Sequence, residues 1–119
     1  MSPRDLLDHA RAIAEADDRA LGQTRTVAAA LLLRQALEES LDDVWERTVP
    51  ALAGVNGRAQ LISLPYYLQD ADLSADVVYA WNRLSTICHH DAYELPPHAD
   101  EVRAMAATVE RLTRWTPPG

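Results

Sequence analysis

Apolar residues recur at helical spacing along most of this chain. Near the N-terminus they form one stripe with charged residues opposite it, made of Leu6, Ala10, Ile13, Ala14 and Leu21. Ser2 is a good helix-capping residue, Pro3 suits the first helical position, and Asp5 lies in the first turn, where the helix dipole favours a carboxylate. We therefore expect a first helix that begins at Ser2 and ends before Gly22.

A second, longer stripe predicts a helix over residues 25–48. Its apolar members are Val27, Ala30, Leu31, Leu33, Leu37, Leu41, Val44 and Trp45. Arg34 and Glu38 fall within this stripe, four residues apart, so their side chains are neighbours on the helix surface. Two interpretations are open. The pair either lies at the edge of the stripe with the guanidinium in water, or it is partly buried and faces a neighbouring helix or a site.

Three further helices are expected beyond Pro50. Residues 50–58 contain two glycines and predict a loop, and residues 59–64 predict a short helix broken or kinked at Pro65. The cap candidates in residues 70–74 predict the start of a helix that continues to about His90 or Tyr93. Its core face is Val77, Ala80, Trp81, Leu84, Ile87 and Cys88. Val102, Met105, Ala106, Val109 and Leu112 predict a last helix over residues 98–115.

These patterns together predict an all-α fold. Strand-like alternation extends over no more than a few residues, and the connections between the expected helices are short. We expect one domain over residues 1–119, built as an up-and-down four-helix bundle with one additional short helix.

Composition narrows the function classes. The chain carries 18 acidic residues against 11 basic ones, and all of the basic residues are arginine. A net charge of −7 argues against a nonspecific nucleic-acid binder, because no basic stripe is present to release counterions. Cys88 is the only cysteine, which excludes an internal disulfide and a thiolate zinc site. The longest apolar run, residues 27–33, is far too short for a membrane span, and residues 1–5 lack a signal-peptide core, so we expect a cytoplasmic protein.

The segment from residue 81 to residue 91 contains the strongest candidates for functional residues, one arginine and two histidines. Arg83 and His90 are seven positions apart and point within about 20° of each other on a helix, whereas His89 points about 100° away from His90. An arginine can hold a phosphate, and a neutral histidine can accept the proton of a ribose 2′-hydroxyl. Tyr79 and Thr86 share the face of Arg83 and can donate hydrogen bonds. This chemistry needs no metal ion, because RNA carries its own nucleophile.

An arginine separated by four to six residues from a histidine, late in a small four-helix bundle, resembles the HEPN superfamily. Five residues separate Arg83 from His89, and six separate it from His90. The run at residues 34–38 is similar to the early long helix of many such domains. Leu84 stands where active members commonly carry a polar residue. The resemblance implies a homodimer whose facing Arg and His residues cleave RNA without a metal, in a bacterial toxin or antiviral-defence system. Other members have lost the activity and serve as binding modules.

On this resemblance Arg83 would anchor a phosphate and His90 would transfer the proton, with His89 as the alternative. Tyr79 and Thr86 would be supporting donors, and the Arg34–Glu38 pair would orient Arg83 or close the bundle beside it. No cofactor and no metal are expected, and the expected partners are a second copy of the chain, RNA and a cognate protein.

Three other interpretations stay open. His90 and Glu94, with Asp91 and His98 nearby, have the residue types of a metal site, although the paired Glu-x-x-His of di-iron bundles is missing. The histidines can also simply cap the end of a helix, where the dipole favours imidazolium. Lastly, the chain can be a catalytically inactive interaction module whose ends present its aromatic residues, namely Tyr66, Tyr67 and Trp115.

Overall fold

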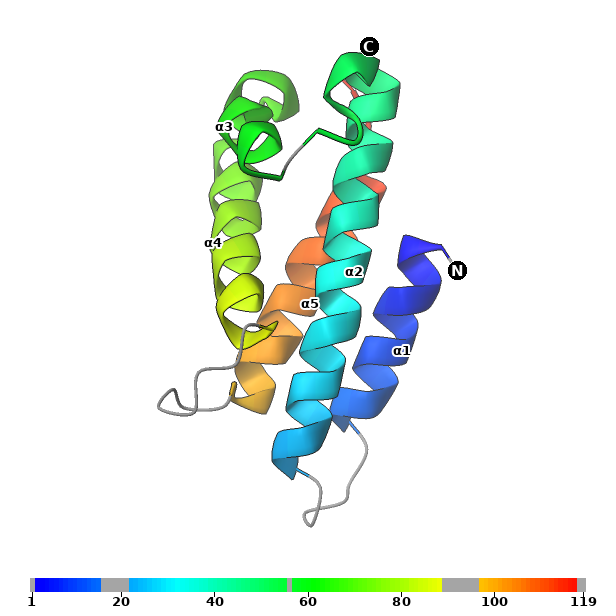
Figure 1. The fold of residues 1–119 in the computed structure, drawn as a ribbon, viewed down its shortest axis with the longest axis vertical. Helices are drawn as coiled ribbons and strands as arrows, with labels where there is room; N and C mark the ends of the chain where they lie inside the picture. Colours follow the sequence, from blue (N-terminus) through cyan, green and yellow to red (C-terminus); the bar gives the residue numbers. More distant parts are fainter. Residues whose placement is uncertain (1, 16–21, 56, 89–96, 118–119) are drawn as a thin grey trace.

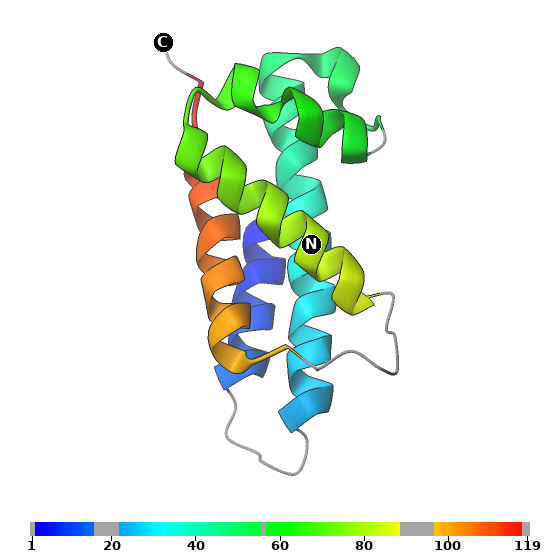
Figure 2. The same ribbon diagram turned by 90° about the vertical axis from the view of Figure 1, so that its left-hand side faces the viewer.

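The computed structural model describes residues 2–15, 22–55, 57–88 and 97–117, and within these it is all-α with no strand. The helices are α1 (Pro3–Glu15), α2 (Gly22–Thr48), α3 (Gly57–Leu68), α4 (Ala71–Cys88) and α5 (Ala99–Arg114), with a 3-10 turn η2 (Pro50–Leu52) between α2 and α3. The all-α prediction is therefore confirmed. Figure 1 shows α1, α2, α4 and α5 lengthwise beside one another, with α3 at the end of the molecule where α2 finishes. Helices that follow one another among these four run in opposite directions, as Figure 2 also shows.

The start of α1 follows the predicted capping chemistry. The hydroxyl of Ser2 accepts a hydrogen bond from the backbone N–H of Asp5 at 3.1 Å, and the Ser2 N–H donates to the Asp5 carboxylate at 3.3 Å. This reciprocal pair satisfies backbone donors that the first turn of a helix leaves open. The bonds from Ser2 also lower the pKa of the Asp5 carboxyl below its usual value.

The core is one cluster of mostly aliphatic side chains contributed by α1, α2, α3, α4 and α5. α5 buries all five of the residues predicted for its stripe, along with Thr108. In α2 the predicted stripe is buried at Ala30, Leu33, Leu37, Leu41, Val44 and Trp45. Leu31 was also placed in this stripe, and that placement is wrong, because its side chain is 51% exposed.

The exposure of Leu31 has a geometric cause. Leu31 and Trp45 are 14 residues apart and point within about 40° of each other, at positions about 21 Å apart along α2. The ring of Trp45 is covered by Tyr67, whose ring meets it edge-on at a centroid distance of 5.5 Å. Since Tyr67 belongs to α3, which lies at the far end of α2, this cover does not extend down to Leu31.

α3 is longer than the sequence predicts. The short helix was expected to be broken or kinked at Pro65; it is not broken there and continues through that proline to Leu68. Leu64 and Leu68 are both buried and one turn apart, so continuing the helix buries a further leucine while the proline removes a single backbone donor near the helix end. At the other end of α3, Gly57 lies against the indole of Trp81 so closely that a Cβ there would be 2.3 Å from Cζ2 of the ring. A glycine at this position therefore lets α3 lie close to α4.

The start of α4 and both ends of α5 agree with the sequence to within a few residues, whereas the predicted ends of the first helix and of the helix that contains Arg83 lie outside the described residues. Asp70 caps α4, its carboxylate accepting from the N–H of Leu73 at 2.9 Å. His98 caps α5, where its ring nitrogen Nδ1 accepts from the N–H of Asp100 at 3.1 Å. Cys88, expected in the core, is only partly buried. Of the helices described, none has the length and apolar character needed to cross a membrane.

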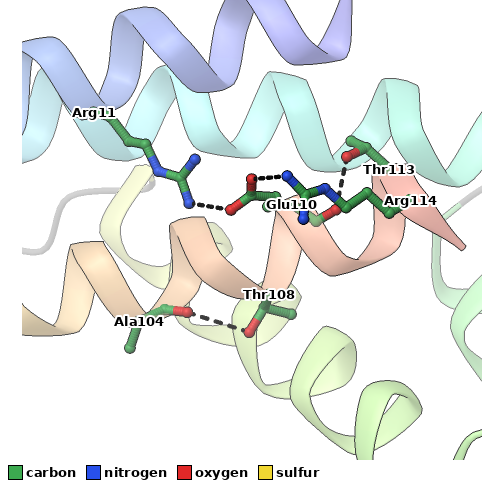
Figure 3. A network of polar contacts seen from close by, with 6 residues as sticks. All are labelled: Arg11, Ala104, Thr108, Glu110, Thr113 and Arg114. Atoms are coloured by element: carbon green, nitrogen blue, oxygen red, sulfur yellow. Dashed lines mark hydrogen bonds and ion pairs between the residues drawn. The ribbon is translucent and has the colours of Figure 1, made fainter.

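Figure 3 shows the ion pair that joins α1 to α5, together with polar contacts within α5. Arg11 of α1 donates to Oε2 of Glu110 at 2.7 Å, and Arg114 pairs with Oε1 of the same carboxylate at 2.9 Å. The hydrogen bond from Arg11, followed by the positive charges of Arg11 and Arg114, lowers the pKa of the Glu110 carboxyl below its ordinary value. On the α4 side, Arg111 pairs with Asp76 at 2.7 Å. Ion pairs therefore tie α5 to both of these neighbours.

Candidate functional site

Arg83, the centre of the predicted site, is engaged by a carboxylate of the next described helix. Its Nε lies 2.8 Å from Oε1 of Glu101, and both side chains are 25% exposed. Arg83 comes from the last third of α4 and Glu101 from the first turn of α5. The helix dipole favours a carboxylate in the first turn of a helix, so it stabilises Glu101 at this position independently of the ion pair with Arg83. The pair bridges α4 and α5 at the protein surface.

Tyr79 joins the same carboxylate from one turn earlier on α4. Its hydroxyl donates to Oε2 of Glu101 at 3.3 Å, while Arg83 takes the other oxygen. The predicted shared face of Tyr79 and Arg83 thus corresponds to two donors that converge on one anionic group. The carboxylate is planar and negatively charged, and it occupies the place that an oxyanion of a ligand would need.

Thr86 does not join this cluster. Its hydroxyl donates to the backbone carbonyl of Asn82 at 3.0 Å, which is the local bond that threonine commonly makes within a helix. Here Thr86 satisfies its own donor within α4, and the structure gives it no bond to Arg83 or Tyr79.

The Arg34–Glu38 pair forms as the spacing predicts. Nε of Arg34 lies 3.1 Å from Oε1 of Glu38, with the two side chains partly exposed. This geometry matches the interpretation that placed the pair at the edge of the α2 stripe. Its hydrogen bond stays within α2, whereas the hydrogen bond of Arg83 goes to α5.

His89 and His90, the predicted proton-transfer residues, lie outside the described residues, as do Asp91 and Glu94. Arg83 is therefore the one member of the predicted Arg–His pair whose geometry the structure gives. Of the four residues considered for a metal site, only His98 is described, and it caps α5. Among the residues that are described, no group of three or more His, Cys, Asp or Glu side chains could hold a metal ion.

A small hollow elsewhere on the surface is separate from this cluster. It has a volume of about 220 Å³, lies between α1, α2 and α5, and has Arg11 and Arg103 among its lining residues. Both arginines are already paired with carboxylates, Arg11 with Glu110 and Arg103 with Asp100. The Arg83 cluster lies on the other side of α5, toward α4, and does not line this hollow.

Glu101 is the site residue that sequence reasoning missed. The only sequence signal was its place in the first turn of the last helix, which the helix dipole already accounts for. Comparison with protein-family models, with curated proteins and with solved structures found no match for this chain.

Proposed function

We propose that this chain is a catalytically inactive protein-interaction module, built as an up-and-down four-helix bundle that resembles the HEPN type. In this proposal it acts in the bacterial cytoplasm, within a toxin–antitoxin or antiviral-defence assembly. The observation that carries the proposal is the 2.8 Å bond from Arg83 to Glu101, because it gives the arginine a carboxylate partner inside the same chain.

This bond works against phosphate binding in two ways. A phosphodiester would have to displace Glu101 from Arg83, and the displaced carboxylate would remain next to it as a like charge. The chain as a whole carries a charge of −7, which repels a polyanion before it reaches the arginine. The same bond stabilises the contact between α4 and α5, a role that needs no ligand.

A metal-independent ribonuclease acting as a homodimer is the second candidate, and one observation favours it. Arg83 and Tyr79 converge on the two oxygens of a single carboxylate, at 2.8 and 3.3 Å. Two donors arranged in this way would suit a phosphate oxygen pair if Glu101 moved aside. His90, or His89 in its place, would then supply the proton transfer within a dimer whose Arg83 residues face each other.

The test is induction of the chain in a bacterial host, followed by growth measurement and mapping of transcript ends. Wild type, Arg83→Ala, His89→Ala and His90→Ala are compared with Arg11→Ala, a matched control that loses an equivalent arginine–glutamate pair on α5. For an interaction module we expect none of the proteins to produce new RNA ends. New ends that Arg83→Ala and His90→Ala abolish, but Arg11→Ala keeps, would replace the proposal with the ribonuclease.

Glu101→Gln sharpens the result. The amide removes the negative charge beside Arg83 and leaves a side chain of nearly the same shape. A ribonuclease held back by this carboxylate should cleave more RNA in the variant, and cleavage by the purified protein should persist in EDTA. An interaction module should cleave no RNA, either as the Glu101→Gln variant or as purified protein in EDTA.

A further inference from the structure

The hollow between α1, α2 and α5, which we call the α1–α5 hollow, has an apolar floor. Four of its lining residues are almost completely buried, namely Ala10, Leu33, Val102 and Ala106. Two of the four are alanines, one on α1 and one on α5, and a side chain that ends at Cβ leaves space between helices. A floor without polar side chains is favourable for the apolar part of a ligand.

The volume of the α1–α5 hollow sets the size of a ligand. It is about 220 Å³. An engineered cavity of about 150 Å³ with aliphatic and aromatic walls binds benzene. The α1–α5 hollow therefore has room for one six-membered ring together with a small polar group, and a larger molecule would extend into solvent.

Two arginines that line the hollow keep hydrogen-bond donors that their ion pairs do not use. Among the described residues, Arg11 donates from Nη2 to Glu110, as Figure 3 shows, and Arg103 donates from Nη1 to Asp100. A guanidinium has about five N–H donors, so each arginine retains several. A carboxylate in the hollow therefore has donors to accept from while both ion pairs stay in place.

The charges that line the hollow favour a ligand with one negative charge. Arg11 and Arg103 are positive and Glu15 is negative, so the lining side chains carry a net positive charge. A second negative charge on the ligand would be repelled by Glu15. This arrangement differs from the Arg83 cluster, where both donors meet one carboxylate that a ligand would have to displace.

We propose that the α1–α5 hollow binds a small monocarboxylate with a compact apolar body, of the size and shape of benzoate. The apolar body lies on the buried floor, and the carboxylate lies at the rim, where it accepts from Arg11 and Arg103. Such a ligand contacts α1 and α5 together, so its binding stabilises the folded chain. The inference goes beyond the interaction role proposed above, because it assigns a small-molecule site that this role does not need.

An NMR titration of the purified, isotope-labelled chain with sodium benzoate tests this proposal. Benzoate is added up to about 20 mM near neutral pH and at constant ionic strength. We expect amide shifts that saturate and are centred on residues 10–15 and 102–106. The dissociation constant should be on the order of millimolar, since a ligand of about nine non-hydrogen atoms makes few contacts. Benzamide, an uncharged molecule of nearly the same shape, should bind at least about threefold more weakly.

Matched variants locate the site. Ala14→Leu fills the hollow from a partly buried lining position and should raise the dissociation constant at least about tenfold, whereas Ala107→Leu, exposed on α5 outside the lining, should leave it unchanged. Arg103→Gln should raise it about threefold, and Arg111→Gln, outside the hollow, should not. Glu15→Gln should lower it about twofold, because a like charge is removed. Circular dichroism checks that the variants keep their helices.

Shifts that do not saturate by about 20 mM overturn the inference, as do shifts centred outside the hollow or benzamide binding as tightly as benzoate. Equal weakening by Arg103→Gln and Arg111→Gln would indicate a general attraction to positive charge and would also overturn it. If Ala14→Leu fails to fold, these two arginine variants still decide, because both side chains are largely exposed. The RNA experiment is independent of all these outcomes, so the interaction role and the carboxylate site are tested separately.

Discussion

Two arginine–glutamate pairs join α5 to its neighbours, and they are closely alike. Arg83 of α4 meets Glu101 at 2.8 Å, and Arg11 of α1 meets Glu110 at 2.7 Å. Their side chains are 25% and 25% exposed in the first pair, and 33% and 27% in the second. Only Arg83 drew a functional hypothesis, because two histidines follow it in the sequence. The similarity of the two pairs shows that an ion pair between helices is enough to explain the position of Arg83, without a catalytic role.

The largest expected effect on stability comes from the core residues next to the two arginine–glutamate pairs, which we call the two bridges. Leu84 and Leu7 are almost completely buried, next to Arg83 in the one case and one turn before Arg11 in the other. We expect Leu84→Ala and Leu7→Ala each to lower the free energy of unfolding by about 2–5 kcal/mol, through lost burial and the cavity left behind. Urea denaturation followed by circular dichroism measures this. If Arg83→Ala lowered the free energy of unfolding as much as Leu84→Ala, the Arg83–Glu101 pair could no longer be treated as a surface ion pair like Arg11–Glu110.

The core and the helices were largely predictable for a physical reason. A buried stripe repeats every 3.6 residues, and the α5 stripe at Val102, Met105, Ala106, Val109 and Leu112 was predicted without error. Leu31 was not, because its burial depends on how far α3 extends along α2. The continuation of α3 through Pro65 depends in the same way on a tertiary gain, the burial of Leu68.

The candidate site was less predictable than the fold. The shared face of Tyr79 and Arg83 follows from helical periodicity alone. Their common partner, Glu101, lies 18 residues beyond Arg83 on another helix, and helical periodicity says nothing about which faces of two helices meet. The sequence therefore indicated the donors of this cluster and missed its acceptor.

A double-mutant cycle compares the two bridges directly. Arg83→Gln, Glu101→Gln and their combination should give a favourable coupling of about 0.2–1 kcal/mol, since water screens a pair exposed to this degree. The matched cycle at Arg11 and Glu110 should also be favourable, and both couplings should shrink in high salt. An absent or unfavourable coupling at Arg83 alone would indicate an arginine held in place for a ligand.

The Arg11–Glu110 pair should also appear in the pH dependence of stability. Its folded-state carboxyl has a pKa lowered from the ordinary value of 4.5, chiefly by the hydrogen bond and charge of Arg11. A lowered folded pKa means that the unfolded chain binds the proton more readily. The stabilisation is therefore complete above about pH 4.5 and is lost as the pH falls through the lower folded value.

Unfolding of wild type and Glu110→Gln between pH 7 and pH 3 measures this contribution. The stability of wild type should exceed that of the variant near neutral pH, and the difference should disappear in acid. Arg11→Gln is the control, because it should remove most of the difference while leaving the carboxyl in place. A difference that stayed constant down to pH 3 would contradict the assignment.

The smallest expected effect is that of Tyr79→Phe, and it separates the structural from the catalytic interpretation of the Arg83 cluster. The change removes one exposed hydroxyl, whose bond to Glu101 is 3.3 Å long, and leaves the 2.8 Å bond of Arg83 intact. We expect the free energy of unfolding to change by no more than about 0.5 kcal/mol, as is usual for surface substitutions. If wild type cleaves RNA and Tyr79→Phe slows that cleavage at unchanged stability, then the Tyr79 hydroxyl contacts a ligand. In that case the Arg83–Glu101 pair has a role that the Arg11–Glu110 pair does not have.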